Sequence, residues 1–152
     1  MSRFNSCRSR PARVSLALVI TSVLLAASPP GHVDAAAGDL DPTFGNGGKV
    51  STDFFGMNDA AHAMIVQGDG KIVVAGFYNS AFSAGFALVR YLGGGGLDPS
   101  FGGTGKVLTD FSGNGDGALA VALQSNGKII AAGAAQGSPN PDFGLARYNS
   151  NG

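Results

Sequence analysis

The chain repeats itself at a fixed interval of 57 residues, and this repeat restricts its fold more than any other feature. Leu-Asp-Pro-Thr-Phe-Gly at 40–45 returns as Leu-Asp-Pro-Ser-Phe-Gly at 97–102, and the Arg-Tyr pair at 90–91 returns at 147–148. The interval is constant, so the copies align without insertion or deletion. A tandem period of this length indicates a repeat architecture, in which each copy builds one supersecondary unit.

Residues 1–37 stand outside the repeat and predict a secretory signal peptide. Four arginines (3, 8, 10 and 13) precede an apolar run from 14 to 27, and small residues follow at 35–37. That order is typical of a leader that is cleaved, here after Ala35 or Ala37. The alternative, an uncleaved anchor, would need about 20 apolar residues to span a bilayer. We therefore expect an exported protein in the periplasm, at the cell surface or outside the cell.

The charge that remains after residue 37 excludes one class of partner. This part of the chain holds six Lys and Arg against nine Asp and no Glu, a net charge of 6 − 9 = −3. Such a chain lacks the basic patch that binds nucleic acid. The only cysteine, Cys7, lies in the leader, so neither disulfides nor thiolate metal sites are expected. We expect three parts: the leader 1–37, a first repeat 38–95 and a second repeat 96–152.

Each repeat is predicted to form four short strands. In the second repeat they are expected at about 106–111, 118–124, 128–133 and 143–148, separated by glycine, proline, asparagine and aspartate. Asp69-Gly70 and Asn126-Gly127 separate apolar runs and favour tight hairpins. No long amphipathic helix is indicated after residue 37.

The strands are apolar on both faces, which favours a β-propeller. Alternate residues of a strand point to opposite faces, and the runs at 61–66, 72–75 and 129–132 are almost wholly apolar. An antiparallel sheet with one wet face would alternate with polar residues. A propeller blade instead lies between two neighbours and is covered on both sides. We therefore predict an all-β fold of two tandem four-stranded antiparallel blades, an incomplete propeller behind a signal peptide.

The repeated motifs resemble those of the delta-60 repeat family of bacterial, usually secreted proteins. They are Leu-Asp-Pro-Ser/Thr-Phe-Gly, Gly-Lys-Val, Thr-Asp-Phe, Gln-x-Asp/Asn-Gly-Lys-Ile and Phe-x-Leu-x-Arg-Tyr, and they cover residues 39–152. The resemblance implies a propeller-like blade and export. It implies no activity, so it brings no catalytic residue and no cofactor. Such repeats usually occur in longer arrays than two copies.

Recurring charged and aromatic residues are interpreted as the structural framework. One expected role is an ion pair, or a cap from an aspartate to the backbone, that ties one repeat to the next. The framework residues are Asp41, Phe44, Arg90, Tyr91, Asp98, Phe101, Arg147 and Tyr148.

Other motifs give weak signals for chemistry. Gly102–Lys106 lacks the first glycine and the Ser/Thr of a phosphate-binding loop. Gly113–Gly117 offers a calcium ion only one aspartate and one amide, so a solvated turn is expected. His62 with Ser83 could form a nucleophilic pair, but Ser83 lacks the first glycine of a nucleophile elbow. We therefore predict no catalytic, cofactor-binding or metal-binding residue.

The least similar segments of the two repeats, 77–85 and 134–142, are the first place to look for recognition. Binding residues favour variable loops on a rigid scaffold. The candidate binding surface consists of Phe77, Tyr78, Phe82 and Asp142.

The leading functional hypothesis is an exported, non-enzymatic protein with an interaction or structural role. The second is a calcium- or carbohydrate-dependent surface binder, and the third is a hydrolase or lyase on a propeller scaffold. Two copies cannot close a ring of about four to eight blades. The alternatives are therefore a truncated longer array, self-association through exposed blade faces, or a small sandwich. No membrane span is expected after signal cleavage, and no other partner is identified.

Overall fold

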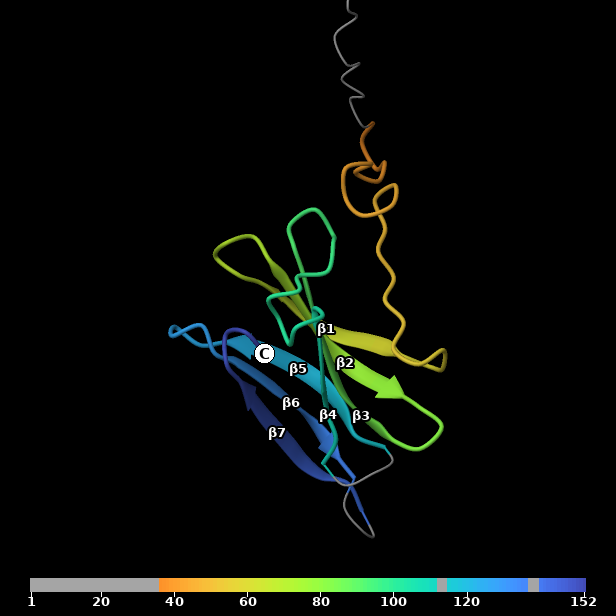
Figure 1. Ribbon diagram of the computed structural model, residues 1–152, viewed down its shortest axis with the longest axis vertical. Coiled ribbons are helices and arrows are strands. Elements are labelled where there is room, and N and C mark those ends of the chain that lie inside the picture. The colour runs from red at the N-terminus through yellow and green to blue at the C-terminus, as the bar shows by residue number, and fades with distance from the viewer. Residues whose placement is uncertain (1–35, 112–114, 137–139) are drawn as a thin grey trace, which may run out of the picture. The chain divides into compact units, whose positions relative to one another are not determined.

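Seven strands form two antiparallel sheets in the computed structural model (Figure 1). The structure describes residues 36–111, 115–136 and 140–152, so the signal peptide expected at 1–37 falls almost wholly outside the described residues. The first sheet has the order β1-β2-β3-β4 and the second β5-β6-β7. The strands are β1 (Ala60–Val66), β2 (Ile72–Asn79), β3 (Ala84–Tyr91), β4 (Lys106–Thr109), β5 (Gly117–Leu123), β6 (Ile129–Ala135) and β7 (Asp142–Tyr148).

The all-β prediction is confirmed, with two unclosed sheets. The described part of the chain contains no helix that could cross a membrane. The predicted hairpins are also present. Gly70 and Gly127 adopt φ values of +80° and +79° in the turns after β1 and β5, a conformation that glycine adopts without steric cost.

The sheets do not coincide with the sequence repeats. Residues 106–111 were expected to begin the second blade, and this expectation is wrong: β4 pairs with β3, with Val107 opposite Leu88. The reason lies in the preceding segment, which folds back along β3. Its backbone bonds run from Asp98 N–H to the Arg90 carbonyl and from Arg90 N–H to the Gly105 carbonyl.

This pairing gives the first sheet a fourth strand from the second repeat. The chain changes sheets between Thr109 and Gly117, rather than between residues 95 and 96. The second sheet has three strands among the described residues, where four were expected. Each repeat therefore supplies three strands to its own sheet, and the second repeat supplies the outer strand of the sheet before it.

A β-bulge interrupts the pairing of the first two strands of each sheet. The register shifts between Ala61 and Ala63 in β1, and between Ala118 and Ala120 in β5. Gly133 lies opposite the second bulge, where a side chain of even one carbon would overlap the Gly117 carbonyl oxygen. Only glycine permits this close approach of two backbones.

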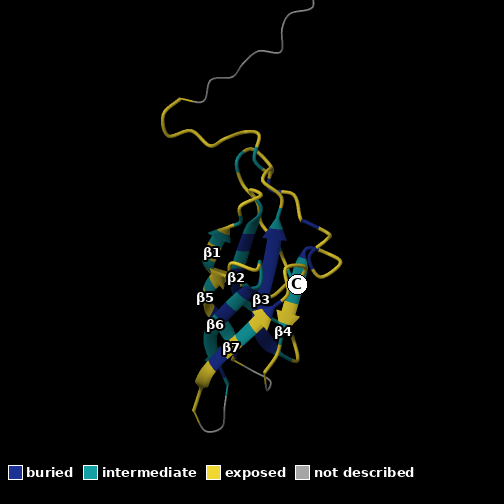
Figure 2. Cartoon of the chain, turned by 90° about the vertical axis from the view of Figure 1, so that its left-hand side faces the viewer, coloured by how far each residue is buried: buried dark blue, intermediate teal, exposed yellow. Residues whose placement is uncertain are grey.

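The core lies between the two sheets, which pack face to face. Val73 and Leu88 of the first sheet are fully buried against Ile129 and Ala131 of the second. Strand β3 is buried at every position but its last, so both faces of the first sheet are covered along it (Figure 2). The sequence pattern predicted such cover for every strand, but Met64 and Val66 of β1 in the same sheet are 57% and 60% exposed.

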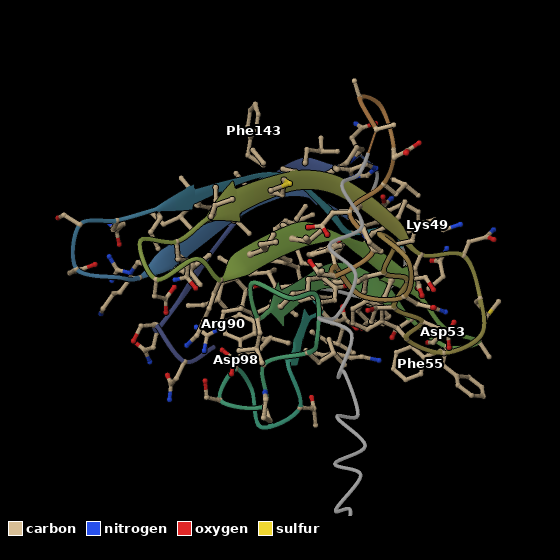
Figure 3. The ribbon with its side chains drawn as sticks, turned by 90° about the horizontal axis from the view of Figure 1, so that it is seen from above. Lys49, Asp53, Phe55, Arg90, Asp98 and Phe143 are labelled. Carbon is tan, nitrogen blue, oxygen red and sulfur yellow. The ribbon has the colours of Figure 1, made fainter. Side chains whose placement is uncertain are left out.

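The outer face of the second sheet is uncovered. Phe143 on β7 is fully exposed, and Leu145 is 67% exposed. Figure 3 shows the Phe143 ring pointing away from the ribbon. The two residues lie on one face of the strand because they are two positions apart.

Candidate binding surface

A buried ion pair connects the two repeats. The Nε of Arg90 in β3 lies 2.8 Å from Oδ2 of Asp98, and both side chains are 5% exposed (Figure 3). Lys71 lies 3.3 Å from the same carboxylate oxygen. Oδ1 of Asp98 accepts hydrogen bonds from the Ser100 hydroxyl at 2.7 Å and from the Ser100 backbone N–H at 3.0 Å. The aspartate thus forms both an ion pair and a backbone cap.

These contacts hold the pKa of Asp98 well below its ordinary value. The Ser100 hydroxyl bond is the largest cause, and its backbone bond, Lys71 and the charge of Arg90 act in the same direction against the opposing effect of burial. All of these groups favour the charged carboxylate. The site is therefore an ionised structural link at neutral pH.

Arg90 extends this link to the second sheet. Its guanidinium donates to the Ser150 carbonyl, just beyond β7, and to the Ser100 hydroxyl. It also lies over the ring of Phe101, 4.7 Å from the centroid, and that ring is fully buried. One side chain thus ties β3, the segment after it and the end of the second sheet together.

The counterparts of this cluster one repeat away are exposed. Asp41 has the same cap from Thr43, with bonds of 2.9 Å and 2.7 Å to Oδ1, and the Thr43 hydroxyl bond lowers its pKa. Arg147 is exposed at the end of β7 and makes no ion pair within the described residues. Phe44 is half-buried, whereas its counterpart Phe101 is fully buried.

The framework tyrosines make equivalent contacts. The Tyr91 hydroxyl lies 2.6 Å from the Thr52 hydroxyl, and that of Tyr148 lies 2.8 Å from the Thr109 hydroxyl. Burial raises the pKa of Tyr148, and the bond to Thr109 opposes this effect. The first bond attaches residue 52 to the end of β3, and the second attaches the end of β4 to the end of β7.

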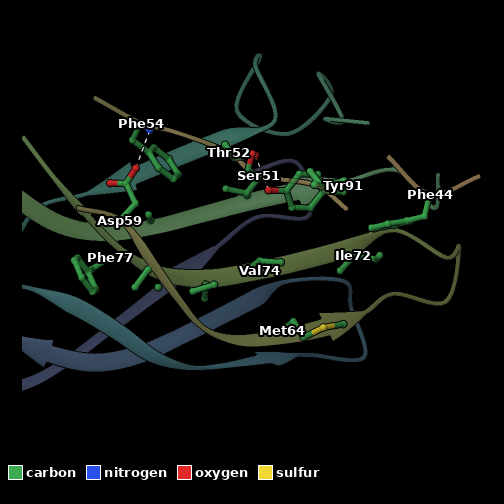
Figure 4. Close-up of a pocket in the computed structure, with 17 residues that line it drawn as sticks. Phe44, Ser51, Thr52, Phe54, Asp59, Met64, Ile72, Val74, Phe77 and Tyr91 are labelled. Atoms are coloured by element: carbon green, nitrogen blue, oxygen red, sulfur yellow. Dashed lines mark hydrogen bonds between the residues drawn. The ribbon is translucent and has the colours of Figure 1, made fainter. Parts of the chain in front are cut away.

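A groove of about 410 Å³ opens on the face of the first sheet that points away from the second (Figure 4). Its floor consists of side chains of β1, β2 and β3, including Met64, Val74 and Val89. Residues 50–54 form a wall above this floor. There the Phe54 backbone N–H donates to the Asp59 carboxylate at 2.9 Å. The lining is mostly apolar, so the groove suits an apolar occupant.

The predicted surface residues are distributed over different places. Phe77 lies on β2, half-buried, with its ring 5.6 Å from that of His62. Tyr78 is only 5% exposed, and its hydroxyl lies 3.2 Å from the Ser83 hydroxyl. Phe82, by contrast, is 93% exposed in the turn between β2 and β3.

Asp142 is exposed at the first position of β7, in the other sheet, where it pairs with Ala135. Three of the four residues therefore lie on strands rather than in loops. Only Phe82 is a projecting loop side chain.

The residues considered for chemistry bond to the backbone or to structural side chains. His62 Nδ1 lies 2.9 Å from the Ala118 carbonyl, across the interface between the sheets. Asp116 is 2% exposed and accepts the backbone N–H groups of Phe111 and Gln136. Residues 113 and 114 of the candidate calcium loop lie outside the described residues.

The glycine-rich stretch before β4 is a turn into that strand. Gly105 N–H donates to the Phe101 carbonyl, and Gly102 N–H donates to the Asn151 carbonyl. Lys106 donates to the Asp53 carbonyl at 2.6 Å and lies over the Phe54 ring. The lysine thus joins β4 to the wall of the groove.

Sequence reasoning did not find the groove. The individual strands were predicted, but the groove depends on where residues 50–54 lie over them. One available signal was that the run at 72–75, which contributes to its floor, is wholly apolar.

A comparison with family models finds one match. Residues 67–101 and 124–152 match a domain of unknown function (DUF5122) described as a beta-propeller. The matched stretches begin 57 residues apart, at Gln67 and Gln124, in agreement with the repeat interval. No curated protein and no solved structure matches the chain. The chain therefore carries beta-propeller-like repeats.

Proposed function

We propose that this chain is an exported, non-enzymatic repeat protein of the delta-60 type, with a structural or interaction role. One observation carries the proposal: the buried charged side chains hold the scaffold together. Arg90 and Asp98 join the repeats, and Asp116 accepts two backbone N–H groups. Groups engaged in this way stabilise a scaffold.

The candidate nucleophilic pair supports the same proposal. His62 Nδ1 lies beside the Ala118 carbonyl, and Ser83 lies beside the Tyr78 hydroxyl. A nucleophilic serine needs its base within hydrogen-bond reach and the base oriented by a third group. The contacts of both residues connect them to other partners.

Export and activity are tested on the protein recovered from a bacterial host. Mass spectrometry of its N-terminus is expected to show removal of residues 1–35 or 1–37. A screen of hydrolase and lyase substrates is expected to give no turnover. Turnover that His62→Ala or Ser83→Ala abolishes would falsify the non-enzymatic role. Turnover that survives both but copurifies with the protein would also contradict it and would place the activity on other residues.

A glycan array, run with calcium and with a chelator, tests the surface-binder hypothesis. We expect no calcium-dependent signal. A signal lost in Phe82→Ala but kept in Phe143→Ala would assign carbohydrate binding to the turn before β3. Phe143→Ala is the matched control because both side chains are exposed phenylalanines.

A further inference from the structure

The groove is the first-repeat counterpart of a buried interface. In the second sheet, Ile129, Ala131 and Tyr148 face the first sheet and are buried. Their counterparts 57 residues earlier are Ile72, Val74 and Tyr91, and all three line the groove. The first-sheet side chains that cover the second sheet are Val73, Ala75, Phe86 and Leu88. The groove therefore has the lining of an interface without the side chains that cover it.

The counterparts of those covering side chains lie on the outer face of the second sheet. They are Ile130, Ala132, Phe143 and Leu145. Phe86 is fully buried, whereas its counterpart Phe143 is fully exposed. Likewise Leu88 is fully buried and Leu145 is 67% exposed. The chain thus carries a second, uncovered copy of each half of its internal interface. One half is the groove on the first sheet, and the other is the outer face of the second sheet.

The polar contacts of the internal interface are duplicated in the same way. Within the chain, Asp98 accepts from Arg90 and lies beside Lys71. One repeat later the cations are Arg147 and Lys128, and one repeat earlier the carboxylate is Asp41. Opposite charges therefore lie on the two uncovered halves, where one copy could meet the next.

The chain also contains a segment that could pair with the open edge of β7 and give the second sheet a fourth strand. Residues 49–52 correspond to β4, but they lie in neither sheet. Since Val107 lies opposite Leu88, the equivalent register sets Val50 of one copy opposite Leu145 of another. Strand addition of this kind satisfies the backbone groups of an open edge.

Residues 40–52, which include the segment that would pair with β7, are anchored in the same way as their counterparts at 97–109. Gly45 N–H donates to the Gly94 carbonyl at 2.9 Å, as Gly102 N–H donates to the Asn151 carbonyl at 2.8 Å. Residues 40–52 are therefore held against the first sheet as residues 97–109 are held against the second. Their other side is where the β7 edge of another copy would pair.

Compensating changes of volume support the same fit. Gly117 contacts Phe77 in the internal interface, where a Cβ on the glycine would lie 3.3 Å from the Phe77 Cβ. The corresponding residues of the uncovered halves are Ala60 and Ala134. One half gains a methyl group where the other loses an aromatic ring.

We infer that copies of this chain associate head to tail, with the outer face of the second sheet of one copy covering the groove of the next. Phe143 of one copy then occupies the groove of the next. Residues 49–52 of that next copy pair alongside β7 of the first, and its Asp41 pairs with Arg147 of the first. The two surfaces differ, so the interface is heterologous and repeats into a ring or a filament. A ring of about four to eight sheets would hold roughly two to four copies. This inference is independent of the proposed non-enzymatic role, and the experiments below measure association alone.

Sedimentation of the full recovered protein over a concentration series tests the inference first. The wild type is expected to associate, and Phe143→Asp is expected to raise the dissociation constant at least about tenfold. The matched control is Phe82→Asp, because Phe82 is similarly exposed but lies outside both halves. A wild type that stays monomeric, or equal weakening by the two substitutions, would overturn the inference.

A charge exchange then tests the direction of association. Asp41→Arg and Arg147→Asp are each expected to weaken association, since each places like charges together. The double variant is expected to regain it, and so is a mixture of the two single variants. Both substituted residues are exposed in the chain, so the fold is expected to persist. Failure of the mixture to associate better than either variant alone would contradict the head-to-tail pairing.

Cysteine pairs test the register. In a Cys7→Ser background, Val50→Cys chains mixed with Leu145→Cys chains are expected to form a disulfide-linked heterodimer on oxidation. Ser51→Cys is the control, because its side chain points to the opposite face of an extended segment. Equal cross-linking through positions 50 and 51 would show that the segment does not add to β7 in this register.

Discussion

At the scale of single residues, position in the array decides what a repeated side chain does. Arg90 and Arg147 occupy the same place in the repeat, yet one is 4% exposed and the other is exposed at the end of β7. The difference comes from the next copy of the Leu-Asp-Pro motif, which follows Arg90 and supplies Asp98. The same chemistry is therefore structural at one position and available for association at the other.

The ionised state of Asp98 gives a pH prediction. Its folded-state pKa lies below the ordinary value of 3.8. The stability it contributes is therefore present above about pH 4 and is lost as the pH falls toward the lower folded-state pKa. Asp98→Asn is expected to lower the melting temperature at pH 7 and to flatten its decline between about pH 4 and pH 2.

Thermal unfolding by circular dichroism at each pH measures this effect. Asp142→Asn is the control, because Asp142 is exposed at the start of β7. If both variants keep the wild-type acid profile, Asp98 does not contribute to stability as an ion.

At the scale of elements, local signals predicted the hairpins and missed one strand pairing. The turns at Asp69-Gly70 and Asn126-Gly127 are specified by neighbouring residues, and both formed as expected. The partner of residues 106–109 is not a local property, because these residues could pair with either adjacent sheet. The pairing is decided by the partial burial of Val107 against the core beside Leu88, and by the fold-back of residues 92–105.

The bulge in the second sheet allows a sharp test of element packing. Gly133→Val is expected to destabilise the protein by at least about 2 kcal/mol, because the new Cβ would overlap the Gly117 carbonyl. Gly94→Ala is the matched control, since a Cβ there meets nothing within 4 Å. Urea denaturation measures both, and a Gly133→Val variant as stable as Gly94→Ala would show that the bulge is not required.

At the scale of the whole molecule, the sequence predicted the scaffold better than its surfaces. The period and the apolar faces sufficed for a propeller-type all-β fold. Exposed blade faces were expected for two copies, but their residues were not. The groove and Phe143 were not named, because they depend on which sheet faces lack a neighbour in the folded chain. Of the predicted binding residues, Phe82 projects into solvent and Tyr78 is buried.

Head-to-tail association predicts that stability depends on protein concentration. Binding to the folded state alone stabilises it by mass action. The apparent melting temperature of the wild type is therefore expected to rise over a hundredfold increase in concentration, and that of Phe143→Asp is expected to stay nearly constant. Differential scanning calorimetry measures both, and parallel behaviour of the two proteins would argue against the interface.

The offset between repeat and sheet has a consequence for how such a gene can grow. The second copy closes the sheet of the first copy with β4, and by the same repeat a further copy would close the sheet of the second. An in-frame duplication of 57 residues within 38–152 would therefore lengthen the array by one sheet and leave its two end surfaces chemically unchanged. Recombination can then alter the number of copies without creating a new kind of edge, so array length is free to vary under selection.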